Sequence, residues 1–141
     1  MPSDYQTAYQ MLGIWAVAKD GGPSSKELHV VYASPGTIAA YRKHGHFPDG
    51  AVLVKEVLRT TTSGTVSSAG ALARWCVIVK DNVGRFSGNK LWGEGWGWSW
   101  FDGANPQKTA STGCTTDCQS CRVPARQSDW ICTGGYPLLI G

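Results

Sequence analysis

Long apolar runs and dense charge are both missing from this chain. No apolar stretch approaches the ~20 residues that a helix needs to cross a bilayer, so the sequence predicts no membrane span. Charged residues make up 16% of the 141 residues, the net charge is +3, and the Lys and Arg residues are scattered. Nucleic-acid binding depends on a basic patch that such scattering does not provide. We therefore expect neither nucleic acid nor membrane as a partner.

The first residues do not predict a leader sequence. Met1-Pro2-Ser3-Asp4 lacks the basic and long apolar segments of a signal peptide. The cysteines nevertheless favour an oxidising compartment or a metal site, because four of the five fall between 114 and 132. Their odd number leaves at least one thiol outside any intramolecular disulfide scheme.

The composition is that of a folded chain with many turns. Hydrophobic residues make up 42%, with 18 Gly and 7 Trp, which favours a sheet-rich domain with aromatic packing. A chain of this length fits one domain, residues 1–141, that buries about two-thirds of its unfolded surface.

The helical segments are predicted from capping residues and apolar spacing. A first helix begins at Ser3 and places Tyr5, Tyr9 and Leu12 on one face. A second helix begins at Ser34-Pro35, with Ser34 as its N-cap, and ends at Gly45. We expect this second helix to pack on a sheet through Ile38 and Tyr41.

The strands are predicted from β-branched and alternating segments, separated at one point by a Thr/Ser/Gly-rich spacer over 60–70. They lie near residues 28–33, 51–59, 74–80 and 95–101. Within the last of them, Trp96, Trp98 and Trp100 share one face, which favours a ridge of core indoles over a ligand-binding platform. The element order predicts an α+β fold, a single domain with an antiparallel β-sheet and packed helices.

The most informative motif is Cys118-Gln119-Ser120-Cys121-Arg122. It has the outline of a haem c attachment site, in which two thioethers tether the porphyrin and the next residue, a histidine, ligates the iron. Arg122 stands at that position, and its protonated guanidinium has no lone pair for iron.

Three interpretations of Cys118 and Cys121 remain open: a haem-tethering pair, a local disulfide, or part of a metal site. Together with Cys114 and Cys132 they supply four thiolates, enough for a tetrahedral zinc site. Structural zinc sites usually combine two close pairs, whereas Cys132 stands alone. The spacing therefore favours disulfides over zinc.

Taken alone, three other candidate residues have simple structural interpretations. Lys55 lies in an alternating run whose two faces each carry one charge, so periodicity does not say which face is buried. His29, at the start of a strand, is more typical of a structural histidine. Cys76, between Trp75 and Val77, is most simply a small buried hydrophobe.

Several segments, in order along the chain, together resemble the cytochrome P-460 and cytochrome c-prime-beta family of bacterial periplasmic haem proteins. They are His29-Val30-Val31-Tyr32, Tyr41-Arg42-Lys43, Phe47-Pro48-Asp49-Gly50-Ala51-Val52-Leu53-Val54-Lys55-Glu56, Val79-Lys80-Asp81, Gly95-Trp96, Asp117 to Arg122, and Thr133-Gly134-Gly135-Tyr136-Pro137-Leu138. The resemblance implies a periplasmic or secreted homodimer, an antiparallel sheet with packed helices, and one covalently bound haem c. Its P-460 branch oxidises hydroxylamine and nitric oxide, and a lysine there crosslinks to the porphyrin.

Carried over residue by residue, the resemblance gives pocket candidates for catalysis and cofactor binding. Lys55 matches the crosslinking lysine, His29 a distal-pocket residue, and Cys76 the position of a distal carboxylate in the hydroxylamine oxidisers. Cys118 and Cys121 match the thioether cysteines, while Arg122 occupies the axial-ligand position. Cys76 could replace a carboxylate base only as a thiolate, which is different chemistry.

Two functions follow from this departure. The first is a domain that has lost haem c ligation and serves as a haem-free binding or structural module, taking a small apolar or nitrogenous ligand. The second is a haem c protein, with hydroxylamine or nitric-oxide oxidoreductase activity, in which His29 or another group replaces the missing iron ligand. The sequence favours the first, because iron ligation and covalent maturation both depend on the absent histidine.

Overall fold

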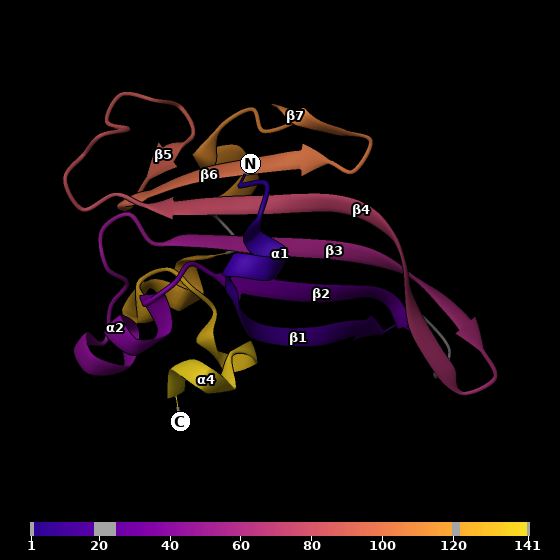
Figure 1. Ribbon diagram of the computed structural model, residues 1–141. Coiled ribbons are helices and arrows are strands. Elements are labelled where there is room, and N and C mark those ends of the chain that lie inside the picture. The colour runs from indigo at the N-terminus through magenta and orange to yellow at the C-terminus, as the bar shows by residue number, and fades with distance from the viewer. Residues whose placement is uncertain (1, 19–24, 120–121, 141) are drawn as a thin grey trace.

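The computed structural model describes residues 2–18, 25–119 and 122–140, and the structural statements below concern these residues. Seven strands form one antiparallel sheet in the order β1-β2-β3-β4-β6-β5, with β7 paired to β6 (Figure 1). The strands are β1 (Gln10–Ala18), β2 (Ser25–Ala33), β3 (Val52–Ser63), β4 (Val66–Lys80), β5 (Trp92–Gly93), β6 (Trp96–Asp102) and β7 (Asn105–Thr109). The predicted α+β class with one antiparallel sheet is confirmed.

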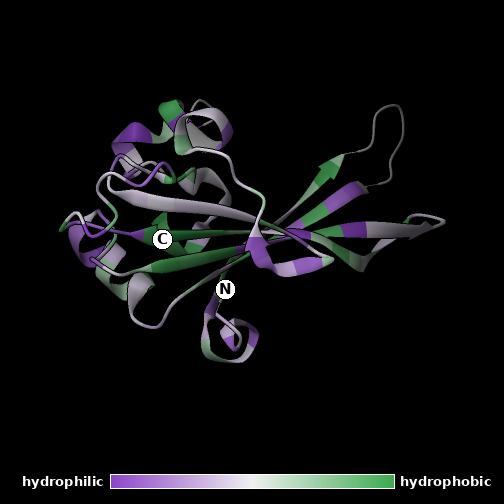
Figure 2. Ribbon diagram, turned by 90° about the horizontal axis from the view of Figure 1, so that it is seen from above, coloured by the Kyte–Doolittle hydropathy of each residue, from purple (hydrophilic) through white to green (hydrophobic). Residues whose placement is uncertain are grey.

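Short helical segments cover the sheet unequally. They are α1 (Tyr5–Ala8), α2 (Thr37–His44), η1 (Thr115–Gln119), η2 (Val123–Ser128), η3 (Thr133–Gly135) and α4 (Pro137–Ile140). Figure 2 shows the N-terminal turn on one side of the sheet and the larger group of helical segments on the other. We call the side packed by α2 and the C-terminal segment the inner face, and the side packed by α1 the outer face.

The main core lies on the inner face. Trp96 and Trp98 of β6 are buried there, and Trp100 packs against the same cluster, so the interpretation of a core indole ridge is confirmed. Ile38 and Tyr41 of α2 belong to this cluster, as predicted. Gly45 ends α2 with a φ of 74°, in the left-handed region that favours glycine at a helix C-terminus.

The predicted first helix is wrong beyond its first turn. α1 ends at Ala8 with Asp4 rather than Ser3 as N-cap, and Leu12 lies in β1. The helical spacing from Tyr5 to Tyr9 is genuine, but Ile14, Trp15 and Val17 then favour a strand over a helix. Because β1 pairs antiparallel with β2, tertiary pairing overrides the local helical pattern.

Two smaller predictions also need correction. α2 begins at Thr37 with Gly36 as N-cap, so the Ser34-Pro35 start was two residues early. The Oγ of Ser34 instead accepts a hydrogen bond from the Val52 amide at 3.0 Å, which ties the helix entry to β3. Residues 60–70, predicted as a spacer between strands, form the far end of the β3–β4 hairpin. Thr and Ser side chains face each other there and stabilise the pairing of the two strands.

A buried hydrogen-bond network fastens α1 to the outer face. The Tyr5 hydroxyl donates to Glu56 and accepts from the Trp75 indole Nε1 at 2.9 Å. Gln6 donates to the same Glu56 carboxylate at 2.6 Å. Burial raises the pKa of Tyr5, and the hydrogen bond to Glu56 acts in the same direction, so the phenol stays protonated.

Replacing Tyr5 by phenylalanine should lower the free energy of unfolding by about 1–3 kcal/mol, the cost of leaving buried polar partners unsatisfied. The ring keeps its packing, but the Trp75 N–H and the Glu56 carboxylate each lose a partner. Urea denaturation followed by tryptophan fluorescence measures the change. Tyr9→Phe is the matched control, because Tyr9 packs on the same cluster and donates no hydrogen bond to any described residue. Equal effects of the two variants would contradict a role for the network.

Candidate functional site

Lys55 and Cys76 face each other across neighbouring strands of the inner face. The register aligns Val31 of β2 with Lys55 of β3, and Lys55 with Cys76 of β4. Cys76 pairs in turn with Trp100 of β6, so the four residues form one row across the sheet. The Lys55 Nζ lies 4.9 Å from the centroid of the Trp100 ring, a cation–π distance.

Arg122 reaches this row from the C-terminal segment. Its guanidinium carbon lies 4.8 Å from the centroid of the Trp98 ring, and its Nη1 donates to the Trp130 carbonyl at 3.4 Å. The planar guanidinium is suited to stacking on an indole. Arg122 therefore packs toward the sheet at the position where the family resemblance places an iron ligand.

Two adjoining cavities share Lys55, Arg122 and Tyr136. The inner one, of about 10 Å³, offers barely the space of one water and also contacts Cys76. The outer one measures about 400 Å³. The inner cavity is completed by Val31, Leu53 and Ile78, and the outer one by Trp15, Cys132 and Gly135.

The C-terminal segment approaches β1 closely at the outer cavity. A Cβ at Gly13 would meet the carbonyl oxygen of Gly135, so only glycine permits this approach. The approach brings Tyr136 against Trp15, with ring centroids 5.8 Å apart. These two rings form an aromatic wall of the outer cavity.

His29 lies on the same face but lines neither cavity. Its register partner on β3 is Val57, so the His29–Val57 pair lies two register pairs from the Val31–Lys55 pair. Its Nε2 lies 3.0 Å from the Glu27 Oε2, and its ring packs on Trp15. Burial lowers the pKa of His29, the nearby Lys55 charge lowers it further, and the hydrogen bond to Glu27 opposes both.

The electrostatic environment of the two cavities is positive. Neither Lys55 nor Arg122 is fully exposed, and no described residue lining either cavity carries a carboxylate. Burial raises the pKa of the Cys76 thiol, although the Lys55 and Arg122 charges act in the opposite direction. Burial likewise raises the pKa of Tyr136 to about 12, so its hydroxyl keeps its proton.

The cysteine predictions have mixed outcomes. Cys76, Cys114 and Cys132 are free thiols, so none of these three contributes to the disulfides that the spacing favours. Cys114 is buried with its sulfur against Gly93, whereas Cys132 is exposed. The two thiols therefore lie in different environments. The Cys118 side chain and all of Cys121 lie outside the described residues, so a disulfide between them, haem attachment and the zinc alternative stay predictions.

The described residues that line the two cavities offer no imidazole to ligate a haem c iron. They offer an ammonium, a guanidinium, a protonated phenol and thiols. Arg122 stacks on Trp98, and the inner cavity beside Cys76 is too small for a porphyrin. No group of three or more His, Cys, Asp or Glu that could hold a metal ion occurs within the described part of the chain.

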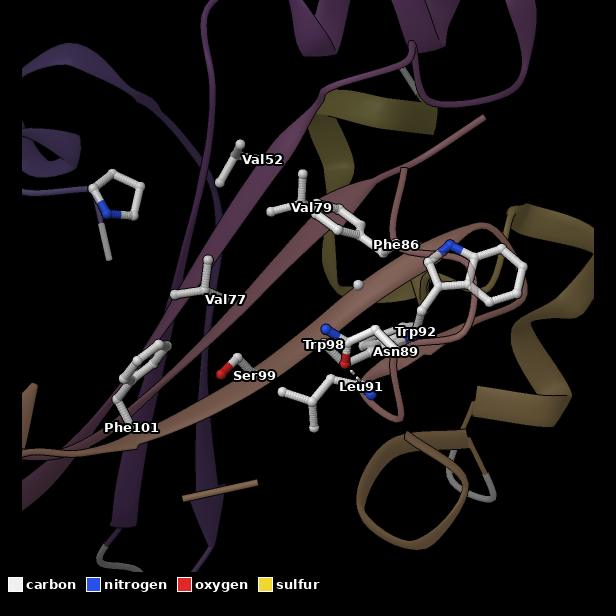
Figure 3. Close-up of a pocket in the computed structure, with 12 residues that line it drawn as sticks. Val52, Val77, Val79, Phe86, Asn89, Leu91, Trp92, Trp98, Ser99 and Phe101 are labelled. Carbon is white, nitrogen blue, oxygen red and sulfur yellow. Dashed lines mark hydrogen bonds between the residues drawn. The ribbon is translucent and has the colours of Figure 1, made fainter. Parts of the chain in front are cut away.

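A separate apolar cavity of about 340 Å³ lies on the outer face (Figure 3). Val52, Val77 and Phe101 line it from the sheet, and Phe86 and Trp92 close its other end. It contains none of the predicted site residues. Sequence reasoning also missed Trp15 and Cys132, which line the outer cavity. Trp15 follows the residues assigned to the first helix, and Cys132 was weighed only as a fourth thiolate that stands alone.

The comparisons with known proteins agree with the fold. The family model described as Cytochrome P460 matches residues 2–133. A search of curated proteins finds no match to the chain. Among the described residues, no helix is both long and apolar enough to cross a membrane. With nearly the whole length matched and the expected antiparallel sheet present, the chain belongs to the cytochrome P460 family.

Proposed function

We propose that this protein is a haem-free member of the cytochrome P460 family. It binds a small molecule in the outer cavity, the larger of the two cavities on the inner face of the sheet. The observation that carries the proposal is the placement of Arg122. Its guanidinium stacks on Trp98 and lines the cavity together with Lys55, at the position where the family resemblance expects an iron-ligating histidine. A residue that cannot ligate iron thus packs against the indole ridge.

The outer cavity supports a binding role. About 400 Å³ falls within the usual range of small-molecule sites, and its lining combines aromatic rings with a few polar groups. Lys55 and Cys76, which match functional positions of the family, meet at the inner end of this space. Their roles as ligand-contacting residues are part of the proposal.

The second candidate is a haem c protein or oxidoreductase acting on hydroxylamine or nitric oxide, and family membership favours it. It requires another iron ligand in place of Arg122. His29 is the first residue to consider, but its Nε2 is engaged with Glu27 and it lines neither cavity. We therefore place this candidate second.

We expect the unaltered chain, secreted into a periplasm that carries haem c maturation, to be purified without a Soret band. Its mass after denaturation should equal that of the polypeptide with no haem added. The measurement is decisive because a haem held by thioethers would stay attached during denaturation. Absorption spectroscopy and intact mass measure both. Stoichiometric covalent haem would overturn the proposed function in favour of the oxidoreductase, and His29→Ala would then test the iron ligand.

Periplasmic or secreted localisation and a homodimer belong to the same proposal, both from the family resemblance. Half-buried apolar side chains around the outer-face cavity, such as Val52 and Phe101, support self-association because a second copy would remove them from water. Sedimentation velocity across a concentration series measures the oligomeric state, and a monomer at all concentrations would contradict the homodimer.

A further inference from the structure

Two cations converge on the outer cavity of the inner face from different parts of the chain. Lys55 comes from the middle of β3, and Arg122 comes from the C-terminal segment. Their charges act on common neighbours: both lower the pKa of Cys76, and Arg122 also lowers that of Tyr136 against the larger effect of burial. Two positive charges beside apolar walls create a positive potential that favours the binding of an anion.

Arg122 is oriented in a way that leaves it able to bind. A guanidinium carries five N–H donors in a planar fork. The guanidinium lies over the Trp98 ring, and the Nη1 bond to the Trp130 carbonyl uses one donor. A carboxylate is the anion whose two oxygens match such a fork.

The walls of the outer cavity indicate the rest of the ligand. Trp15 and Tyr136 present aromatic rings, tilted by 54° to each other, beside the two cations. The Tyr136 hydroxyl remains protonated at neutral pH and can donate to an anion. A flat ring packs on such walls at little entropic cost because it has few rotatable bonds.

We propose that the cavity between Lys55, Arg122, Trp15 and Tyr136 binds a small aromatic carboxylate. The carboxylate lies against the Arg122 fork and the Lys55 ammonium, and the ring packs on Trp15 and Tyr136. This inference rests on the proposed haem-free function and names its ligand class. It replaces the apolar or nitrogenous ligand that the sequence suggested.

The test uses the full purified chain, after its absorption spectrum has shown whether haem is present. Benzoate, its neutral isostere benzamide, and acetate are each titrated at low ionic strength, with binding followed by calorimetry and tryptophan fluorescence. We expect saturable binding of benzoate, at least tenfold weaker binding of benzamide and acetate, and weakening of benzoate binding as salt is added. A haem-loaded chain would refute the proposed function. A haem-free chain that does not bind benzoate would refute only the inference that the ligand is an aromatic carboxylate.

Variants then assign the binding to the cavity. Arg122→Gln should weaken benzoate binding about 10- to 100-fold, the usual effect of losing a charge-assisted hydrogen bond. Arg126→Gln is the matched control, because Arg126 lies in the same segment and stacks on Trp130 but lines neither cavity. Arg122→Lys keeps the charge but not the fork and should show an intermediate loss.

Three further results would overturn the proposal. Equal affinity for benzoate and benzamide would show that charge plays no part. Equal affinity for benzoate and acetate would show that the aromatic walls play none. An Arg126→Gln effect as large as that of Arg122→Gln would place the site elsewhere. Near-UV circular dichroism of each variant separates a lost ligand contact from a lost fold.

Discussion

Replacing Asp129 by asparagine should lower the free energy of unfolding by about 3–5 kcal/mol, the usual cost of removing one partner of a buried ion pair. The Asp129 Oδ1 lies 2.5 Å from the Lys80 Nζ, and the two side chains are only 14% and 7% exposed. The other carboxylate oxygen accepts the Phe47 amide at 3.0 Å. Removing the charge leaves the Lys80 ammonium buried, 4.8 Å from the centroid of the Trp96 ring.

Asparagine is the appropriate replacement because of the backbone at this position. Asp129 has a φ of 57°, in the left-handed region that Asn and Asp tolerate better than most residues. Alanine would add backbone strain to the effect of the lost charge. Asparagine keeps the shape of the side chain, so its effect reports the loss of the ion pair alone. The pair matters to the site because it fastens the C-terminal segment, which carries Arg122 and Tyr136, to the end of β4.

Urea unfolding of Asp129→Asn, Lys80→Met and the double variant forms a double-mutant cycle. The cycle gives the interaction free energy between the two side chains. We expect the double variant to be less destabilised than the sum of the single variants, because no unpaired charge then remains buried. Asp4→Asn is the control for removing one negative charge, since Asp4 is exposed and its side chain makes no capping hydrogen bond. An Asp129→Asn cost below about 1 kcal/mol, the range of a surface pair, would show that Lys80 is compensated without Asp129.

Local patterns in the sequence predict the central strands and α2 well. The alternating segment around Lys55 and the tryptophan ridge in β6 each carry enough periodicity to define a strand, and the antiparallel sheet follows from them. β1 was missed because its pairing with β2 decides its conformation, and that pairing is not visible in the segment itself. The short β5 and β7 depend on β6 in the same way.

The site is less accessible to sequence reasoning than the fold. Only the family resemblance could bring Lys55 and Cys76 together, because a strand pattern does not reveal its register. The meeting of Arg122 with Trp98 joins an irregular segment to a strand, and no periodicity predicts such a contact. The same holds for Lys80 and Asp129, which are far apart in the chain and meet only in the folded protein.

Replacing Arg122 by histidine should convert a chain without haem into one that carries it covalently. The change completes the haem c attachment sequence that Cys118 and Cys121 begin, because a histidine then follows the second cysteine directly. It supplies an imidazole, and it removes the guanidinium that stacks on Trp98 beside the inner cavity. Because histidine is smaller than arginine and no longer adds a positive charge next to Lys55 at neutral pH, the cavity also becomes larger and less cationic.

The variant is expressed beside the unaltered chain in the same periplasm with haem c maturation. Its denatured mass should rise by one haem and its spectrum should show a Soret band, while benzoate binding is lost with the guanidinium. Cys118→Ser in the histidine background is the matched control, because it keeps the imidazole but removes one thioether and should reduce covalent attachment. If Arg122→His folds yet takes up no haem, the loss of haem binding extends beyond residue 122, and the closed inner cavity between Lys55, Cys76 and Tyr136 becomes its structural cause.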